Sequence, residues 1–272
     1  MEIYEFGQRI IREAGDFIKL RMKEDFKVDA KLNPHDLVTD VDKETETYIY
    51  ERILERYPDH RIIGEEGHGT DIEDMSGVLW IVDPIDGTLN FVHQLQNFAV
   101  SIGVYVDGEP YCGLILDVMG GVLYHARVGS GAFKDDIRLD EMRDTTLDRS
   151  LIGMNANWVI KDQIGPAFKK IVEQTRSTRS YGSAALEMAY VATGILSASV
   201  FFRLHPWDYS AGMIIIDEAG GRTTNLLGEE IDILKKDSIL TGNKAIHKEL
   251  TDYFTSDAAF IAGHRRVHGE KR

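Results

Sequence analysis

WIVDPIDGTLNF, residues 80–91, runs from an apolar segment directly into two carboxylates that are separated by a proline. The continuous apolar run over residues 78–82 predicts a buried strand. Pro84 disfavours helix for the residue before it, so we expect Asp83 and Asp86 to lie on a sharp turn at the end of that strand. Two carboxylates three positions apart on such a turn can point at one spot.

Gly87-Thr88 opens the next segment, which is predicted to be a helical turn whose free N–H groups can hold a phosphate. Carboxylates beside an anion cradle indicate a cation between them, and hard divalent cations such as Mg²⁺ take oxygen ligands. Further acids stand at predicted element boundaries: Glu65-Glu66 after a short strand, Asp42 shortly after Thr39, and Asp208 at a helix start. No comparable cluster of His and Cys accompanies them.

Each acid also has a purely structural explanation. Asp42 and Asp208 would make good helix N-caps, and Glu65-Glu66 would suit a solvated loop. The DPIDGT segment could be an Asx-turn followed by a cap. Taken together, the acids favour a hard-metal phosphate site.

Working outward from this stretch, the sequence predicts a mixed α/β (α+β) fold. Apolar residues at helical spacing predict a first helix near residues 3–18 and a second near 42–56. Strand-like runs joined by short turns between residues 78 and 128 indicate an antiparallel sheet. After a charged stretch at 135–149 the pattern alternates between strand and helix, which is typical of helices packed on a sheet. We therefore predict two lobes, residues 1–145 and 146–272.

The composition excludes several functions. The chain has 272 residues, 31 Lys and Arg against 45 Asp and Glu, and a net charge of −14. This acid excess argues against a nucleic-acid-binding surface, and we predict that the basic run at residues 264–266 is a solvated tail. There is no apolar stretch long enough for a membrane span, and the acidic first residues lead us to expect no secretory signal. The single cysteine, Cys112, lies in an apolar run. We expect a cytoplasmic protein whose partner is a small phosphorylated metabolite.

The sequence resembles the inositol monophosphatase family of Mg²⁺-dependent, lithium-sensitive sugar phosphatases. The matching segments follow the family order and cover most of the chain: DLVTDVD (36–42), IIGEEG (62–67), WIVDPIDGTLNFVH (80–93), FAVSIG (98–103), GSGAF (129–133), RSYGSAALEMAYVATG (179–194) and PWDYSAGMIIIDEAGG (206–221). The combination of WxxDPIDGT with a later WDxxAG is highly specific. The resemblance implies a layered αβαβα sandwich, two or three Mg²⁺ ions per active site with Mn²⁺ as a substitute, and a homodimer.

The resemblance also implies roles for individual residues. The first metal would be held by Glu65, Asp83 and the Ile85 carbonyl, and the second by Asp83, Asp86 and Asp208, with Glu66 in support. Phosphate would bind the backbone N–H groups of Gly87 and Thr88. Asp42 would pair with the Thr88 hydroxyl, and this dyad together with Glu65 would orient the attacking water.

Substrate choice is less constrained. Gly182, Ser183 and Ala184 correspond to a loop that contacts the sugar or inositol in the family. Phe201 occupies the position where relatives acting on inositol phosphate commonly carry a glutamate, and phenylalanine cannot accept a hydroxyl hydrogen bond. Phe201 is either a core residue or part of a pocket for a larger substrate, with Arg203 or Arg179 taking a second anionic group. Inositol 1-phosphate, fructose 1,6-bisphosphate and NADP therefore remain alternatives.

Two other classes compete with direct attack by water. A phosphatase with an aspartyl nucleophile needs carboxylates two positions apart after the strand, whereas Asp83 and Asp86 are three apart. An inactive phosphate-binding relative would have lost part of the acid set, which is complete here. The sequence assigns no role to Asp40.

Overall fold

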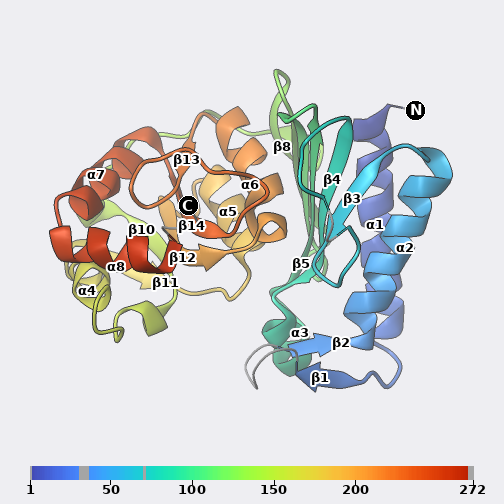
Figure 1. Ribbon diagram of the computed structural model, residues 1–272, viewed down its shortest axis with the longest axis horizontal. Helices are drawn as coiled ribbons and strands as arrows, with labels where there is room; N and C mark the ends of the chain where they lie inside the picture. The colour runs from blue at the N-terminus through green and yellow to red at the C-terminus, as the bar shows by residue number, and fades with distance from the viewer. Residues whose placement is uncertain (1, 31–36, 70–71, 269–272) are drawn as a thin grey trace.

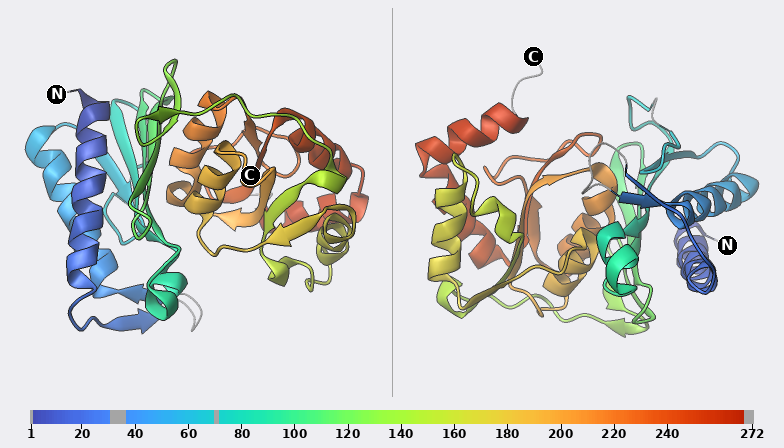
Figure 2. Two further views of the ribbon diagram at one scale, coloured as in Figure 1. Left: turned by 180° about the vertical axis from the view of Figure 1, so that it is seen from behind. Right: turned by 90° about the horizontal axis from the view of Figure 1, so that it is seen from below.

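Five layers of helices and sheets make up the computed structural model, which describes residues 2–30, 37–69 and 72–268 (Figure 1). In order across the molecule they are a helix pair, a seven-stranded sheet, a second helix pair, a five-stranded sheet and an outer helix layer. The view from below shows the same order (Figure 2). The αβαβα sandwich expected from the sequence is confirmed. Asp36, the first residue of the DLVTDVD segment, lies outside the described residues.

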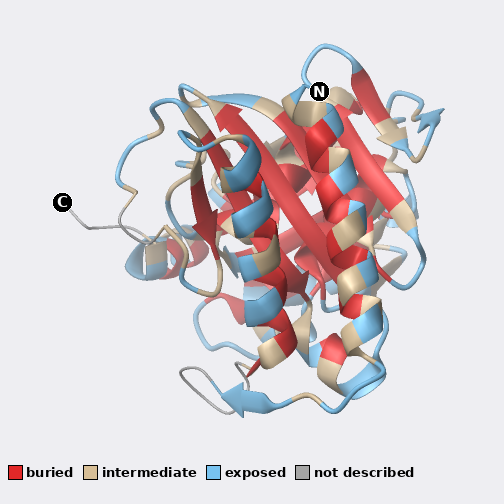
Figure 3. Cartoon of the chain, turned by 90° about the vertical axis from the view of Figure 1, so that its right-hand side faces the viewer, coloured by how far each residue is buried: buried red, intermediate tan, exposed pale blue. Residues whose placement is uncertain are grey.

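The first helix pair, α1 (Ile3–Arg21) and α2 (Asp40–Arg56), covers one face of the larger sheet. Each helix has its buried side toward the sheet and its exposed side outward (Figure 3). The sheet has the order β3-β4-β5-β6-β7-β8-β9, and only the β3–β4 pair is parallel. Its strands are β3 (Arg61–Gly64), β4 (Val78–Asp86), β5 (Ala99–Val106), β6 (Glu109–Asp117), β7 (Val122–Arg127), β8 (Gly131–Lys134) and β9 (Ile137–Arg138).

The central helix pair, α5 (Ala184–Ala192) and α6 (Pro206–Glu218), lies between the two sheets and is almost entirely buried. Such helices are apolar on all sides, because both faces meet a sheet. Paired glycines let α6 approach the larger sheet: Gly103 and Gly113 are opposite each other on β5 and β6. A Cβ on Gly113 would lie 2.3 Å from the Ala211 carbonyl oxygen of α6, so no larger residue fits there without moving the helix.

The smaller sheet has the order β11-β10-β12-β14-β13 and is parallel over its first three strands. Its strands are β10 (Leu151–Met154), β11 (Ser177–Arg179), β12 (Ala198–Leu204), β13 (Arg222–Thr224) and β14 (Asp237–Gly242). Its outer face is covered by α4 (Gly165–Gln174), α7 (Lys244–Thr255) and α8 (Ala258–His268). The remaining elements are the hairpin β1 (Val28–Ala30) and β2 (Leu37–Thr39), helix α3 (Thr88–Gln94), and 3₁₀ turns at Leu147–Arg149 and Ala156–Trp158.

The two sheets occupy consecutive parts of the chain, residues 61–138 and 151–242, joined by the segment 139–150. The expected boundary between residues 145 and 146 falls in this segment, and the division into two lobes stays a prediction. Among the described residues, no helix is both long and apolar enough to cross a membrane.

Two sequence expectations were wrong. The expected sharp turn at Asp83 is instead a continuation of β4 to Asp86, with a shift in the pairing with β5 between the two aspartates. The expected solvated tail at residues 264–266 belongs to α8: Arg265 and Arg266 are exposed as expected, but His264 is buried against the outer face of the smaller sheet. The helical spacing of Phe260, Gly263 and His264 accounts for that burial.

Candidate active site

Three carboxylates from two layers meet where the larger sheet faces α6. Asp83 and Asp86 come from the end of β4, and Asp208 comes from the first turn of α6. Each offers an oxygen within 4.8 Å of the others. Asp208, which follows Asp86 by 122 positions in the sequence, thus joins Asp83 and Asp86 in one acidic cluster, which the sequence placed only at separate element ends.

A shift in strand pairing aims Asp83 and Asp86 at the same point. Regular β4 would place residues three apart on opposite faces, because side chains alternate along a strand. The pairing with β5 shifts between Asp83 and Asp86, and Pro84 removes one backbone donor there. Asp83 Oδ1 accepts the Ile85 N–H at 3.0 Å, which fixes its carboxylate over the irregular segment.

Capping boxes hold two of the acids. Asp208 is the third residue of α6 and accepts the His205 N–H at 2.7 Å. Asp42 is the third residue of α2 and accepts the Thr39 N–H at 2.9 Å and the Thr39 hydroxyl. Both acids therefore cap their helices from the third position, not from the N-cap itself. This structural role coexists with a place in the acidic site.

The Thr88 hydroxyl links Asp42 to the end of β4. Thr88 Oγ1 lies 3.2 Å from Asp42 Oδ1 and 3.2 Å from the Ile85 carbonyl oxygen. The contact between Thr88 and Asp42 is the one that the family resemblance implies, although its catalytic role stays a prediction. Gly87, immediately before, is the N-cap of α3 and has a φ of 101°, a left-handed conformation that favours glycine.

Asp86 is held by the N-terminus of α5. The Ser183 hydroxyl donates to Asp86 Oδ2 at 2.5 Å, the Ala185 N–H donates to the same oxygen at 2.6 Å, and the Ala184 N–H donates to Oδ1 at 3.2 Å. Helix N-termini stabilise negative charge in this way. The sequence placed Ser183 and Ala184 against substrate. In the structure the Ser183 hydroxyl and the Ala184 N–H both contact Asp86, and a contact of either residue with substrate stays a prediction.

Glu65 and Glu66 lie in the loop after β3, next to the cluster. Glu65 faces Asp83 closely enough for a hydrogen bond between the two carboxyl groups, and its charge acts on Asp86 and Asp208. The Glu66 N–H donates to a buried carboxylate of α2, Glu46, at 2.7 Å.

Sequence reasoning missed Glu46, which fixes this loop from behind. Its other oxygen accepts the His68 N–H at 3.2 Å and lies 2.6 Å from His68 Nδ1. The His68 ring stacks on Tyr50. An acid on the buried face of a predicted helix is the signal that could have found it.

Burial shifts the pKa of every acid in the cluster upward. Loss of hydration raises the pKa of Asp83 and of Asp208 well above the usual range, and repulsion by the neighbouring carboxylates adds to it. Burial also raises the pKa of Asp86 to about 6, against the hydrogen bonds from Ser183 and the α5 amides. The pKa of Asp42 is raised to about 6 by burial as well, and the Glu65 charge contributes.

A divalent cation fits this donor set. The site offers carboxylate oxygens and a backbone carbonyl at Ile85, which are the ligands that Mg²⁺ and similar hard cations prefer. Carboxylates that repel one another when buried gain most from a positive charge placed among them.

Comparisons with known proteins agree with this geometry. The model of the inositol monophosphatase family matches residues 1–258. The chain belongs to the inositol monophosphatase family. It is 46% identical to the inositol-1-monophosphatase of Bacillus subtilis over 93% of this chain and 96% of that protein. It is 34% identical to the fructose-1,6-bisphosphatase/inositol-1-monophosphatase of Thermotoga maritima over 97% of this chain and 100% of that protein.

Solved structures of the family share the fold. The crystal structure of inositol monophosphatase II from Staphylococcus aureus matches with a TM-score of 0.92 and 49% identity, covering 100% of both chains. The expected enzyme class, a phosphoric monoester hydrolase of the inositol monophosphatase type, is confirmed.

Arg203 and Phe201 lie on β12 but in different surroundings. The Phe201 side chain packs against the central core, so the core explanation of this residue is the better one. Arg203 is exposed and lines a depression of about 980 Å³ that also includes Trp158, Lys161 and Leu89, the neighbour of Thr88. Arg179, the other arginine considered for a second anionic group, donates to Ser177 and Thr178 of its own strand.

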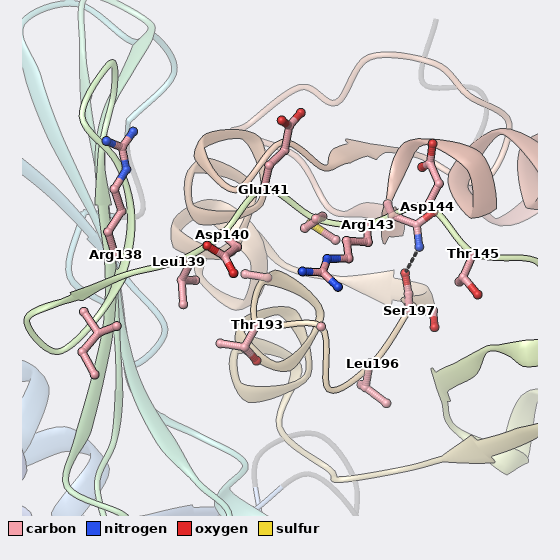
Figure 4. A pocket seen from close by; sticks show the side chains of 15 residues that line it. Arg138, Leu139, Asp140, Glu141, Arg143, Asp144, Thr145, Thr193, Leu196 and Ser197 are labelled. Carbon is pink, nitrogen blue, oxygen red and sulfur yellow. Dashed lines mark hydrogen bonds between the residues drawn. The ribbon is translucent and has the colours of Figure 1, made fainter.

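A second cavity, of about 690 Å³, lies along the segment that joins the two sheets (Figure 4). It is lined by residues 137–145 and by the end of α5, and the Arg143 side chain extends into it. None of the clustered carboxylates lines this cavity. The acidic cluster is therefore the candidate active site, and this cavity is not.

Proposed function

We propose that this chain hydrolyses a small phosphomonoester, of the inositol 1-phosphate class, with Mg²⁺ and by direct attack of water. One observation carries the proposal: Asp83, Asp86 and Asp208 converge beside the left-handed Gly87 and the start of α3. Two solved relatives support it. A structure of SaIMPase-II that is 47% identical to this chain holds inositol monophosphate, and an IMPase/NADP phosphatase that is 26% identical is complexed with Mg²⁺ and phosphate.

The ligand assignments follow the family. Glu65, Asp83 and the Ile85 carbonyl would hold one ion, and Asp83, Asp86 and Asp208 a second, with Glu66 in support. When bound, the ions would lower the pKa of water and neutralise the charge that develops on the phosphate and the leaving oxygen. The same proposal predicts two or three ions per active site and predicts that Mn²⁺ can substitute for Mg²⁺.

The protein's own groups would orient the reaction. Thr88 Oγ1 donates its proton toward Asp42 Oδ1, which leaves its lone pairs free to accept a hydrogen bond from the attacking water. As the water gives its proton to Thr88 Oγ1, the Thr88 proton would pass to the Asp42 carboxylate. In the metal-free protein, burial raises the pKa of Asp42 to about 6. The backbone N–H groups of Gly87 and Thr88 would hold the phosphate.

A phosphorylated nucleotide is a second candidate substrate. The depression beside Leu89 is large and is lined by the aromatic residue Trp158, by the cationic residues Lys161 and Arg203, and by one carboxylate, Asp162. These groups suit an aromatic base and an anionic group better than a bare polyol. A structure of SaIMPase-II, 48% identical to this chain, holds 2′AMP. The alternative use of fructose 1,6-bisphosphate rests on the name of the Thermotoga relative.

The test is phosphate release with and without Mg²⁺ from inositol 1-phosphate, 2′AMP, NADP and fructose 1,6-bisphosphate. We expect release only with Mg²⁺. Arg203→Ala should lower kcat/KM for 2′AMP and NADP more than for inositol 1-phosphate. Equal losses on all substrates would remove the nucleotide candidate, and release that persists in EDTA would overturn the metal mechanism.

The same protein preparation tests two further family expectations: inhibition by lithium in the phosphate-release assay, and a homodimer by size-exclusion chromatography. The cytoplasmic location also stays a prediction.

A further inference from the structure

Glu187 is a buried carboxylate that the proposed reaction does not use. It lies on α5, one turn after the residues that hold Asp86, and is 3% exposed. Buried carboxylates are rare unless they are paired, because their hydration is lost. We therefore expect the Glu187 carboxyl group to make contacts that compensate for its lost hydration.

One Glu187 oxygen fixes the loop that precedes α5. Glu187 Oε1 accepts the Tyr181 N–H at 2.7 Å. From the opposite side, the Asn90 side chain of α3 donates to the Tyr181 carbonyl at 2.6 Å. The peptide groups on both sides of Tyr181 are thus held, one by the central helix pair and one by the helix that starts at Thr88.

This loop touches both parts of the candidate active site. Ser183, two residues after Tyr181, donates its hydroxyl to Asp86 at 2.5 Å and caps α5 by accepting the Leu186 N–H. The Gly182 carbonyl oxygen lies 3.1 Å from the position that a Cβ on Gly87 would take. A shift of the loop would move the groups that hold Asp86 and also the neighbour of the phosphate cradle.

The other Glu187 oxygen reaches into a small space in the smaller sheet. Glu187 Oε2 has no hydrogen-bond partner among the described residues, and neither has the buried Ser199 Oγ. Both atoms lie within 2.7 Å of the position that a Cβ on Gly153 would occupy. Gly153 pairs with Ser199 across β10 and β12, so the glycine leaves the room into which the carboxyl group fits.

Burial is the main reason that the pKa of Glu187 is raised to about 7. The backbone hydrogen bonds at Tyr181 and Gly182 oppose this shift, and the charge of Asp86 adds to it. The acceptor function of Oε1 toward Tyr181 does not require the charge, since a protonated carboxyl group keeps a carbonyl oxygen. Glutamine can therefore reproduce the contact, whereas leucine cannot.

We propose that Glu187 is a positioning residue of the phosphatase site, which holds the loop of residues 181–183 against Asp86 and Gly87. This inference rests on the function proposed above, in which Asp86 is a ligand of Mg²⁺. Glu187 touches neither the metal ligands' oxygens nor the phosphate cradle. It acts through the Tyr181 backbone and the Ser183 hydroxyl.

The test compares Glu187→Leu, Glu187→Gln and a control, Ser199→Ala, which removes the other unpartnered group from the same space. Three properties are measured: amide hydrogen exchange over residues 180–185 in EDTA, the Mg²⁺ concentration that gives half of the Mg²⁺-induced rise in Tm, and kcat and KM. For Glu187→Leu we expect at least tenfold faster exchange at Tyr181, at least a fivefold higher half-saturating Mg²⁺ concentration and at least a tenfold lower kcat/KM. Glu187→Gln and Ser199→Ala should stay within about twofold of wild type.

Several results would overturn the proposal. A folded Glu187→Leu protein with wild-type exchange and wild-type Mg²⁺ dependence would show that the residue only fills space. A Glu187→Gln protein as impaired as Glu187→Leu would show that the charge matters and not the hydrogen bond to Tyr181. If Glu187→Leu does not fold, Glu187→Asp replaces it, because its shorter carboxylate withdraws from Tyr181 but keeps the polarity. The same loss of loop protection and Mg²⁺ affinity is then expected, and its absence refutes the proposal.

Exchange and Mg²⁺ dependence need no substrate. If wild type hydrolyses none of the phosphate esters but Glu187→Leu changes both loop exchange and Mg²⁺ dependence as expected, the proposed function fails and the positioning role stands. If wild type is active and Glu187→Leu changes neither loop exchange nor Mg²⁺ dependence, only the positioning role fails.

Discussion

Replacing Asp83 by Asn separates the metal function of the acidic cluster from its effect on stability. Asp83 is 1% exposed, and its Oδ1 accepts the Ile85 N–H. Its other side faces the Glu65 carboxyl group. Asparagine keeps an oxygen for Ile85 and offers an amide donor to Glu65, so the local hydrogen bonds survive while the charge is lost.

The structure gives the size of the repulsion that the substitution removes. Asp83, Asp86 and Asp208 have oxygens within 4.8 Å of one another. At that distance and an effective dielectric constant near 20, two ionised carboxylates repel by about 3 kcal/mol. Protonation relieves part of this repulsion in the metal-free protein. We therefore expect metal-free Asp83→Asn to gain about 1–3 kcal/mol of unfolding free energy at pH 7.5, which is a rise of a few degrees in Tm.

Activity should change in the opposite direction. Loss of a ligand shared by two ions should remove about 4 kcal/mol of transition-state stabilisation, which is about a 10³-fold fall in kcat/KM. The assays are thermal unfolding in EDTA and in Mg²⁺, and phosphate release from inositol 1-phosphate. The control is Asp40→Asn, because the Asp40 carboxylate accepts the Lys27 N–H at 3.1 Å and is not among the clustered acids. Near-wild-type turnover by Asp83→Asn, or a fall in its metal-free Tm, would refute the reasoning.

Three further predictions follow from other parts of the structure. The pKa values of Asp42 and Asp86 are raised from 3.8 to about 6. Between about pH 4 and pH 6 the metal-free folded state therefore binds more protons than the unfolded state, and its stability falls as pH rises. The increase in unfolding free energy on adding Mg²⁺ should therefore grow from pH 4 to pH 6, by up to about 3 kcal/mol for each group. Denaturant titrations in which this increase is the same at both pH values would contradict the pKa shifts. Gly113→Ala places a Cβ 2.3 Å from the Ala211 carbonyl of α6 and should destabilise the protein by about 1–3 kcal/mol, measured by urea unfolding; an unchanged midpoint would mean that α6 moves freely. Glu46→Gln weakens the contacts to the Glu66 N–H and to His68, so calorimetry should show several-fold weaker Mg²⁺ binding with a modest loss of stability, and unchanged binding would remove Glu46 from the support of this loop.

The sequence predicted the strongly patterned elements well. Apolar residues at helical spacing identified α1 and most of α2, and the continuous apolar runs identified β4, β5 and β6. Such patterns survive because burial on one face of an element selects side chains directly. The short edge strand β11 was missed, because its residues are polar and lie at the edge of the smaller sheet.

The acids of the site were predictable and their supports were not. Asp83 and Asp86 stand out because they directly follow a continuous apolar run and are separated by a proline. Glu46, Glu187 and Asn90 act through backbone groups that are 20, 6 and 91 residues away in the sequence. Apart from the position of Glu46 on the buried face of a helix, no local pattern marks these contacts, since tertiary packing creates them. The same packing gave Asp40 its contact with Lys27, which the sequence left unexplained.

The consecutive order of the two sheets has a consequence for synthesis of the protein. All seven strands of the larger sheet leave the ribosome before α5 and α6 exist. The face that these helices later cover carries apolar side chains, among them Leu79, Ile81 and Ile115. A nascent chain of which residues 1–150 have emerged from the ribosome therefore presents an uncovered hydrophobic sheet, which is a binding surface for chaperones and a starting point for aggregation. Translation speed over residues 150–218 then sets how long that surface stays open.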